Sequence, residues 1–305
     1  MRLVTFLPPG LPPGLAATPE ETALAAARLG ALAEESVVDL RAASEAMPSS
    51  MIALLALGPA GIARAREALA VGLRSRSSRV RHALAAVRLL APVPRPGKIL
   101  GVGRNYGAHA AEGGLARQEK PRIFVKLSTS VIGTGTPIRK PPSVAKLDYE
   151  TELAVVIGTP GRDIDERDAL AHVAGYTILN DVSARELQFD VSPPQTSFAK
   201  SMDGFCPMGP SLATPDEFAS VADIPLSCFV NGEEVQRAST RDMIFPVPAL
   251  IAYLSAYVTL LPGDVIATGT PAGVGAFRKP PRYLEPGDVV RMEIPGIGVL
   301  ENPIV

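Results

Sequence analysis

Three carboxylates next to two apolar runs are the residues of this chain best suited to chemistry. Glu150 and Glu152 lead into residues 153–157, an apolar run with the composition of a buried strand. Because side chains alternate along a strand, Asp148, Glu150 and Glu152 are expected on one face. Asp181 ends a second apolar run. Carboxylates gathered at an apolar strand repel one another and resist burial unless a cation lies among them.

The chemistry of the ligand atoms indicates which cation this is. Carboxylate oxygens suit a hard divalent ion, so Mg2+ is expected first, and Mn2+ or Ca2+ in its place next. The first prediction from the sequence is therefore a divalent metal site built by Glu150, Glu152 and Asp181.

A histidine and a glutamate three residues apart form a second group. His109 and Glu112 follow a Gly-rich strand end, and a short helix there would place them one turn apart. A carboxylate beside an imidazole orients the ring and raises its basicity, which suits a general base. An ordinary surface helical pair is the alternative. A dinucleotide-binding loop is a weaker alternative, because the Gly-x-Gly run here lacks the third glycine at the required spacing.

Groups that can stabilise negative charge come later in the chain. Arg185 and Gln188 lie one helical turn apart, and Lys200 follows a Pro-containing loop. Arg can hold a carboxylate through two hydrogen bonds and Lys supplies a compact charge, so both could stabilise charge on a substrate oxygen. A surface salt-bridge network is the alternative for Arg185. The small residues of 267–275 would let backbone N–H groups and the Thr270 hydroxyl approach an anion.

Composition excludes several kinds of partner. The 305 residues include 30 Lys plus Arg and 31 Asp plus Glu, so the net charge of -1 provides no basic field for nucleic acid. The nearly uncharged segment 247–262 is too short to span a membrane. The N-terminus lacks the long apolar stretch of a secretory signal, so a cytoplasmic location is expected. The two cysteines, Cys206 and Cys228, are expected to be buried apolar residues rather than a disulfide or a nucleophile.

The elements that must position these residues divide the chain into two predicted domains. Residues 1–92 are expected to form a small α/β domain with helical periodicity through 20–35 and 62–90, and with short strands at 1–7 and 37–40 that could pair. A Pro-rich connector leads to residues 93–305, the predicted catalytic domain. Its strands are expected at 98–102, 123–126, 153–157, 175–180, 226–230, 265–268 and 289–294. This spacing favours a β-rich sandwich or roll over a regular βαβ fold.

Taken together, five motifs resemble those of the fumarylacetoacetate hydrolase family from Lys98 to Val305. They are Gly-Arg-Asn-Tyr-x-x-His-x-x-Glu, Asp-Tyr-Glu-x-Glu-Leu-Ala, Asn-Asp-Val-Ser-Ala-Arg, Lys-Ser-Met-Asp-Gly-Phe-Cys-Pro and Thr-Gly-Thr-Pro-x-Gly-Val-Gly. The resemblance implies an α+β, β-rich fold with a mixed β-roll or sandwich, usually dimeric, that holds one Mg2+ or Mn2+. Larger hydrolases of the family have a further acidic ligand, and this chain is more similar to the shorter acylpyruvate-hydrolase and hydroxymuconate-isomerase branch.

The resemblance also assigns roles to single residues. Glu150, Glu152 and Asp181 would bind the metal, while His109, Glu112 and Lys200 would be catalytic. Tyr106, Arg185, Gln188, Gly269 and Thr270 would contact the substrate. The loop 189–197 is expected to line the pocket, but it offers no clear cationic anchor for the distal end of a substrate.

The reaction implied is cleavage of a carbon–carbon bond in a small 2-oxo acid, such as an acylpyruvate or fumarylpyruvate, through a metal-stabilised enolate. His109 with Glu112 would deprotonate the attacking water, and Lys200 with Arg185 would stabilise the oxygen under attack. Isomerisation or decarboxylation of a hydroxymuconate or oxaloacetate uses the same enolate and stays open. A non-catalytic protein stabilised by its metal is the alternative of another class. A homodimer acting in aromatic catabolism is expected, with a small-molecule substrate and with neither nucleic acid nor membrane as a partner.

Overall fold

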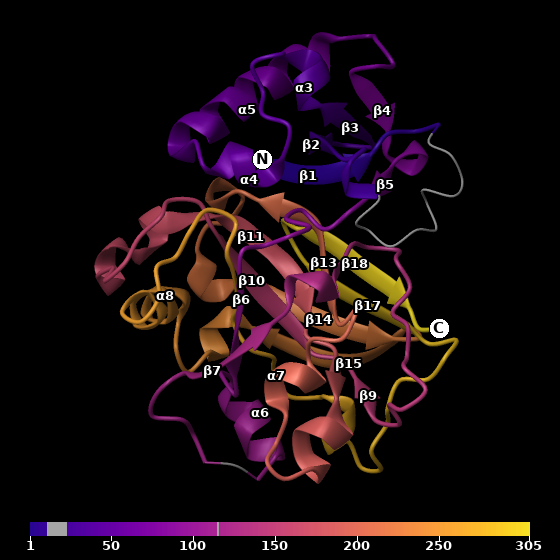
Figure 1. Cartoon of the computed structure of the whole chain (residues 1–305), viewed down its shortest axis with the longest axis vertical. Coiled ribbons are helices and arrows are strands. Elements are labelled where there is room, and N and C mark those ends of the chain that lie inside the picture. Colours follow the sequence, from indigo (N-terminus) through magenta and orange to yellow (C-terminus); the bar gives the residue numbers. More distant parts are fainter. Residues whose placement is uncertain (11–22, 115) are drawn as a thin grey trace.

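One large sheet runs through most of the molecule and joins segments that lie far apart in the sequence (Figure 1). The computed structural model describes residues 1–10, 23–114 and 116–305. Within these ranges the sheet has twelve strands, of which β5 (Arg88–Leu89) pairs with β1 and β8 (Val131–Ile132) pairs with β13. The other ten lie side by side in the order β4 (Arg81–Ala83), β3 (Ser36–Asp39), β2 (Arg28–Ala33), β1 (Arg2–Leu7), β13 (Cys206–Ala213), β11 (Val173–Asn180), β10 (Thr151–Ile157), β16 (Val265–Ala267), β6 (Ile99–Gly103) and β7 (Arg122–Lys126).

Two smaller sheets complete the β structure of the described residues. Four antiparallel strands form the first, in the order β15 (Glu233–Ser239), β14 (Pro225–Val230), β17 (Val289–Ile294) and β18 (Gly298–Pro303). The second pairs β9 (Leu147–Asp148) with β12 (Ser183–Ala184). Apolar side chains of β10 and β11 share one core with those of β14 and β17, so the four-stranded sheet packs on the large sheet. The β16–β6 and β13–β8 pairs are parallel, so the large sheet is mixed, and the predicted β-rich α+β fold is confirmed.

Apart from the 17-residue α5, the helices of the described residues are short, and they lie around the sheets. They are α3 (Leu40–Ala43), α4 (Met51–Leu55), α5 (Gly58–Arg74), α6 (Gly107–Glu112), α7 (Thr196–Ala199) and α8 (Val247–Ser255), with one π-helical turn at Glu186–Asp190. Single turns of 3-10 helix lie at Leu84–Ala86, Ser128–Ser130, Pro215–Glu217, Val221–Asp223, Thr240–Asp242 and Gly275–Phe277, and a longer one spans Glu166–His172. No helix of the described residues has the length and apolar character to cross a membrane.

The N-terminal elements occupy the upper part of Figure 1 and join the rest through β1. This strand pairs with β13 at Arg2↔Ala213 and Leu3↔Leu212, and the surrounding apolar side chains form one core with those of β10 and β11. Strand pairing and a shared core therefore connect the two sides of the predicted boundary. The division into domains at residue 92 stays a prediction.

Several expectations for the N-terminal region are wrong. The predicted helix 20–35 contains β2 instead, and residues 20–22 of it lie outside the described residues. The second predicted helix ends at Arg74, and β4 and β5 follow it. Strands β1 and β3 do not pair directly, because β2 lies between them. The Ala- and Leu-rich composition favours helices only weakly, and pairing on both edges of β2 outweighs that preference.

The strands predicted for the catalytic part are confirmed to within two residues at each end: β6, β7, β10, β11, β14, β16 and β17. Their pairing explains why the acidic residues meet. Thr151 of β10 lies opposite Asn180 of β11, so Glu150 and Asp181 lie next to each other just beyond the paired strands. The Asp181 N–H donates to the Glu150 carbonyl over 2.9 Å. Strand β16 also ends at this end of the sheet, where the loop from Thr268 begins.

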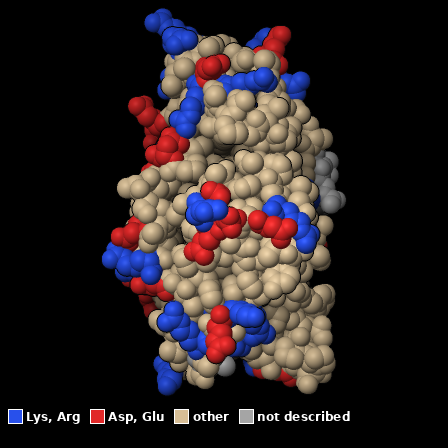
Figure 2. Space-filling model, turned by 90° about the vertical axis from the view of Figure 1, so that its left-hand side faces the viewer, with Lys and Arg blue, Asp and Glu red and all other residues tan. Residues whose placement is uncertain are grey.

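Charged groups of both signs are interspersed over the face of the molecule shown in Figure 2, and no patch of a single sign dominates it. This distribution agrees with the formal net charge of -1. It gives no support to binding of a polyanion on that face.

The close approach of β11 and β13 leads to a first prediction. A Cβ added at Gly175 would lie 2.4 Å from the carbonyl oxygen of Ala213, a backbone atom that can move only with its strand. We expect Gly175→Ala to lower the free energy of unfolding by about 1–3 kcal/mol, measured by urea denaturation, because overpacking displaces the strand pairing.

Gly107→Ala is the matched control, since nothing lies within 4 Å of a Cβ there and the residue opens α6. Its stability should stay within about 0.5 kcal/mol of the wild type. Equal stabilities for the two variants would show that β11 and β13 tolerate separation.

Candidate active site

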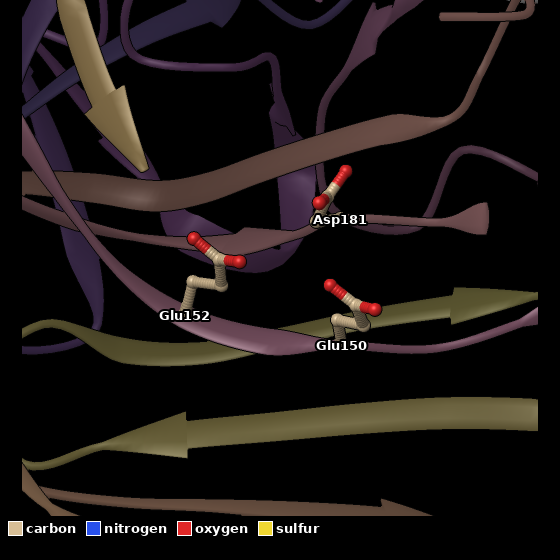
Figure 3. A group of neighbouring side chains, drawn as sticks. All are labelled: Glu150, Glu152 and Asp181. Atoms are coloured by element: carbon tan, nitrogen blue, oxygen red, sulfur yellow. The ribbon is translucent and has the colours of Figure 1, made fainter. Parts of the chain in front are cut away.

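Three buried carboxylates meet at the end of β10 and β11. Glu150, Glu152 and Asp181 each offer an oxygen, and these oxygens all lie within 4.8 Å of one another. Figure 3 shows Glu150 and Glu152 rising from one segment toward the side on which Asp181 lies. None of the three is more than 5% exposed. The predicted metal ligands are thus brought together in a geometry that a single cation can bridge.

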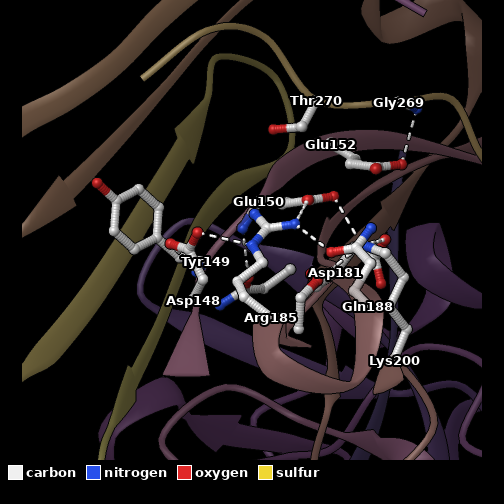
Figure 4. A network of polar contacts seen from close by, with 12 residues as sticks. Asp148, Tyr149, Glu150, Glu152, Asp181, Arg185, Gln188, Lys200, Gly269 and Thr270 are labelled. Carbon is white, nitrogen blue, oxygen red and sulfur yellow. Dashed lines mark hydrogen bonds and ion pairs between the residues drawn. The ribbon is translucent and has the colours of Figure 1, made fainter. Parts of the chain in front are cut away.

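Three cationic side chains contact the acids: Lys126, and Arg185 and Lys200, which are labelled in Figure 4. The Lys200 ammonium donates to Glu150 Oε2 over 2.9 Å, to Asp181 Oδ2 over 2.6 Å and to Ser183 Oγ over 2.7 Å. The Lys126 ammonium donates to Asp181 Oδ1 over 2.5 Å and to the Lys200 carbonyl. All of these groups are buried, so each ion pair compensates a charge that water does not reach.

Arg185 connects the metal-binding acids to a fourth acid. Its Nη1 donates to Glu150 Oε1 over 2.6 Å and to Gln188 Oε1 over 2.8 Å, while its Nε donates to Asp148 Oδ2 over 2.8 Å. Asp148 also accepts from the N–H groups of Gly275 and Ala276. Residues 149–150 separate β9 from β10, and the expectation that Asp148 shares a face with Glu150 and Glu152 stays a prediction.

The charges at this end of the sheet do not cancel. They comprise four acids and three bases: Asp148, Glu150, Glu152, Asp181, Lys126, Arg185 and Lys200. One negative charge is left over, and it falls on Glu152, which makes no ion pair with a described residue. Its one hydrogen bond within the described chain comes from the Gly269 N–H over 2.8 Å.

The pKa shifts follow from this imbalance. Burial raises the pKa of Glu152 well above its ordinary value, and the charges of Asp181 and Glu150 raise it further. Burial also disfavours charge on Glu150, but Lys200 and Arg185 outweigh it and lower the pKa of that carboxyl. An all-oxygen site with one uncompensated negative charge fits a divalent cation.

The predicted His109–Glu112 pair is confirmed as a contact. Both residues lie on α6, and His109 Nδ1 is 2.8 Å from Glu112 Oε1. Glu112 Oε2 accepts from the Gly273 N–H over 2.9 Å, which ties the pair to the 267–275 segment. The His109 ring is buried, and the ring of Phe277 lies beside it with 5.7 Å between centroids. The imidazole is therefore held in place from two sides.

The segment after β16 is shaped by Gly269 and Asn105. Gly269 has φ +101°, and a Cβ there would lie 2.7 Å from that of Asn105. Asn105 donates to the carbonyls of Thr268 and Phe245 over 2.7 and 3.0 Å. The nearby Thr270 hydroxyl accepts from Gln236. A residue with a side chain at position 269 would move the N–H that Glu152 accepts.

One cavity of about 230 Å³ unites these groups. Its lining combines acidic, basic and aromatic side chains: Arg104, His109, Arg122, Phe124, Glu150, Glu152, Arg185, Gln188, Phe189, Lys200, Thr270 and Phe277, with Val102, Gly103, Pro194 and Thr196 between them. Asp181 lies just behind the lining, bound to Lys200. Residues from the predicted loop 189–197 contribute to the wall.

Two residues that the resemblance assigned to the substrate, Tyr106 and Gly269, are absent from the cavity lining. The buried hydroxyl of Tyr106 has no hydrogen-bond partner among the described residues. Burial, which raises the pKa of this hydroxyl, keeps it neutral. Cys206 is buried in β13, and burial raises the pKa of its thiol to about 12. This agrees with the expectation that it is no nucleophile.

Comparison with known proteins identifies the family and its fold. The sequence profile described as fumarylacetoacetate (FAA) hydrolase C-terminal matches residues 98–305. The chain belongs to the fumarylacetoacetate hydrolase family. Oxaloacetate tautomerase FAHD2A, mitochondrial, from Homo sapiens is 44% identical over 271 residues, which cover 88% of this chain and 84% of the relative.

Solved structures of similar proteins extend over the whole chain. Maleylpyruvate hydrolase from Sphingobium sp. SYK-6, in complex with manganese (II) ion and pyruvate, is 30% identical with a TM-score of 0.78, covering 100% of this chain and 99% of that one. 2-Hydroxyhepta-2,4-diene-1,7-dioate isomerase from Mycobacterium marinum is 33% identical with a TM-score of 0.73, covering 100% and 98%. Membership of a fumarylacetoacetate hydrolase family that contains these enzymes supports catalysis over a purely structural metal. The predicted homodimer, cytoplasmic location and role in aromatic catabolism stay predictions.

The uncompensated charge of Glu152 leads to a second prediction. Glu152→Gln should melt no lower than the wild type without metal at neutral pH, because it removes a buried carboxylate that like charges destabilise. Folding raises the pKa of Glu152, so protonation of this carboxyl stabilises the folded wild type at low pH. This contribution is lost as the pH rises above the ordinary Glu pKa of about 4.3, and the variant has no such contribution to lose.

Thermal unfolding with and without Mg2+ tests this role. At about 100 times Kd, Mg2+ should stabilise the wild type by about 2.7 kcal/mol and the Glu152→Gln protein by much less. The exposed Glu234→Gln variant is the control and should respond as the wild type does. An undiminished Mg2+ response in Glu152→Gln would remove Glu152 from the ligand set.

Proposed function

We propose that this protein is a divalent-metal-dependent enzyme that interconverts the keto and enol forms of a small 2-oxo acid such as oxaloacetate. The observation that carries the proposal is that one small cavity is lined both by the acids of a cation site and by an imidazole paired with a carboxylate. The 44% identity to an oxaloacetate tautomerase over most of both chains supports the choice of reaction.

Glu150, Glu152 and Asp181 would hold the metal. When bound, a divalent cation supplies Lewis-acid chemistry that favours loss of a proton next to the 2-oxo group. Arg185 is placed to bind the substrate carboxylate, because its Nη2 is buried and has no hydrogen-bond partner among the described residues. Gln188 lies within hydrogen-bonding distance of the same guanidinium and orients it.

His109 would move the proton. Because Nδ1 faces the Glu112 carboxylate, the tautomer with hydrogen on Nδ1 is favoured, and Nε2 keeps its lone pair for the substrate. The C3–H bond breaks, its proton goes to Nε2, and its electron pair forms the C2=C3 double bond while the C2=O π pair moves to the oxygen. The imidazolium then gives a proton from Nε2 to the C2 oxygen, which completes the enol. Glu112 stabilises the imidazolium that exists between these transfers.

Lys200 would act by positioning the ligands. Its ammonium hydrogens point to Glu150, Asp181 and Ser183, so all three are used within the protein. The surrounding acids also raise the pKa of Lys200 against the opposing effect of burial, so it stays charged. The contact between Lys200 and a substrate oxygen that the sequence suggests stays a prediction.

Hydrolysis of a carbon–carbon bond is the second candidate. The His109–Glu112 pair favours it, since an imidazole supported by a carboxylate can deprotonate water as well as carbon. Similarity to maleylpyruvate hydrolase along the whole chain supports it too. The two reactions differ in whether water reaches the carbonyl carbon.

The role of His109 leads to a third prediction. His109→Gln should lower kcat for oxaloacetate tautomerisation by about 100- to 10,000-fold, the range typical for loss of a general base, as measured by ultraviolet absorbance of the enol. Thermal stabilisation by Mg2+ should persist, because the histidine is not among the metal ligands. His172→Gln is the control, since that ring hydrogen-bonds the Thr159 carbonyl and does not line the cavity. Full activity in His109→Gln would exclude it as the base.

Product analysis separates the two candidate reactions and is the fourth prediction. In deuterium oxide with Mg2+, the enzyme should speed incorporation of deuterium at C3 of oxaloacetate, followed by proton NMR, without accumulating pyruvate above the uncatalysed level. A chelator should stop the exchange. If an acylpyruvate is instead cleaved to pyruvate and an acid faster than oxaloacetate exchanges, the protein is a hydrolase.

A further inference from the structure

We propose that Arg104 and Arg122 bind the distal carboxylate of the substrate, so that the enzyme selects 2-oxo dicarboxylic acids over 2-oxo monocarboxylic acids. This inference rests on the proposed function, because it concerns the far end of the same substrate. It supplies the cationic anchor that the loop 189–197 lacks.

Neighbouring strands bring the two arginines together. Strand β6 ends at Gly103, which pairs with Arg122 at the start of β7. Arg104 follows directly, and both arginines line the cavity that also contains Glu150, Glu152 and His109. Glu150 and Glu152 are buried, whereas Arg104 is half-buried and Arg122 is exposed. The cavity therefore has a buried acidic end and a basic end nearer to solvent.

The positive charges of Arg104 and Arg122 are not neutralised by an acid of the described chain. Neither guanidinium group forms an ion pair or hydrogen bond with a described residue, in contrast to the side chains of Arg185 and Lys200, which are bound to acids. Burial lowers the pKa of Arg104, and the nearby charge of Arg122 lowers it further. Two like charges held close together without a counter-ion provide a site for an anion.

The backbone keeps Arg104 in an unfavourable conformation. Its φ is +60°, in the left-handed region that residues with a Cβ rarely adopt. The following residue, Asn105, is held by hydrogen bonds to Thr268 and to both backbone polar groups of Phe245. The strain is thus maintained by the surrounding structure, and it directs the Arg104 side chain to the cavity wall.

The number of charges in the cavity agrees with a dianionic substrate. The acidic end has one uncompensated negative charge, so a bound divalent cation leaves a single positive charge there. The carboxylate next to the 2-oxo group neutralises that charge. A second carboxylate then needs a cation elsewhere in the cavity, and Arg104 and Arg122 are the cavity cations without an acidic partner in the described chain.

A binding experiment tests the inference without relying on turnover. Oxamate and N-oxalylglycine share the oxalyl head, but only the second carries a distal carboxylate. In calorimetric titrations with Mg2+ present, the wild type should bind N-oxalylglycine at least about tenfold more tightly than oxamate. Arg122→Gln and Arg104→Gln should each remove most of this preference, and the double variant should remove all of it. Oxamate affinity should change little in any of them.

Controls keep the interpretation clear. Arg122→Lys keeps the charge and should retain part of the preference, while the exposed Arg167→Gln should behave as the wild type. Because Arg122 is exposed, its substitution should leave the fold intact, and circular dichroism of each variant checks this. Equal affinity of the wild type for the two ligands, no measurable binding of N-oxalylglycine, or an unchanged preference in the double variant would overturn the inference.

Kinetics separate this inference from the proposed function. Oxaloacetate should exceed its C4 methyl ester in kcat/KM by about tenfold or more in the wild type, mainly through KM, and the double variant should lose this difference. A wild type that binds N-oxalylglycine preferentially but tautomerises neither substrate would refute the proposed function and leave the carboxylate site standing. Tautomerisation of both substrates with equal kcat/KM would refute the site alone.

Discussion

Burying four carboxylates at one end of a sheet is the constraint on which the rest of the structure depends. Asp148, Glu150, Glu152 and Asp181 are nearly free of solvent, so each needs a cation or a backbone donor. Lys126 comes from β7, Arg185 follows β12, and Lys200 follows α7. Each cation thus fixes a separate segment against the acids, and loss of one would leave a buried charge unpaired, which typically costs about 3–5 kcal/mol.

The residues that the sequence predicts well are those whose signal is local. Apolar runs predict β10 and β11, whose pairing makes Glu150 and Asp181 meet, and the three-residue spacing of His109 and Glu112 predicts their contact. Alternation is a weaker guide for Asp148, because it assumes an unbroken strand and residues 149–150 separate β9 from β10. Tyr106 is attributed to the pocket by resemblance alone, whereas its side chain is buried and does not line the cavity.

Residues brought into the site by long-range pairing were missed. Lys126 is buried, while its neighbour Val125 is 46% exposed. A surface strand usually buries its apolar side chains and exposes its charged ones, and this strand does the opposite. That reversal is the signal that could have identified Lys126. Arg104 and Arg122 are adjacent only through the β6–β7 register. Strand β13 contains Pro207, Gly209 and Pro210, and a prediction from local sequence alone would not place a central strand there. These features depend on which strands are neighbours, and local composition carries little information about that.

The surroundings of His109 bear on which of the two candidate reactions is favoured. A tautomerase needs a base that reaches carbon, while a hydrolase also needs room for a water molecule directed at a carbonyl. The Phe277 ring lies 5.7 Å from the His109 ring and stacks at 6.1 Å on Phe189, so an aromatic side chain borders the base and a second one packs on the first. Apolar rings offer no hydrogen bonds to hold an attacking water in position. Glu112, held by the Gly273 N–H, keeps the imidazole from turning toward solvent. These surroundings support the proposed proton transfer between carbon and oxygen.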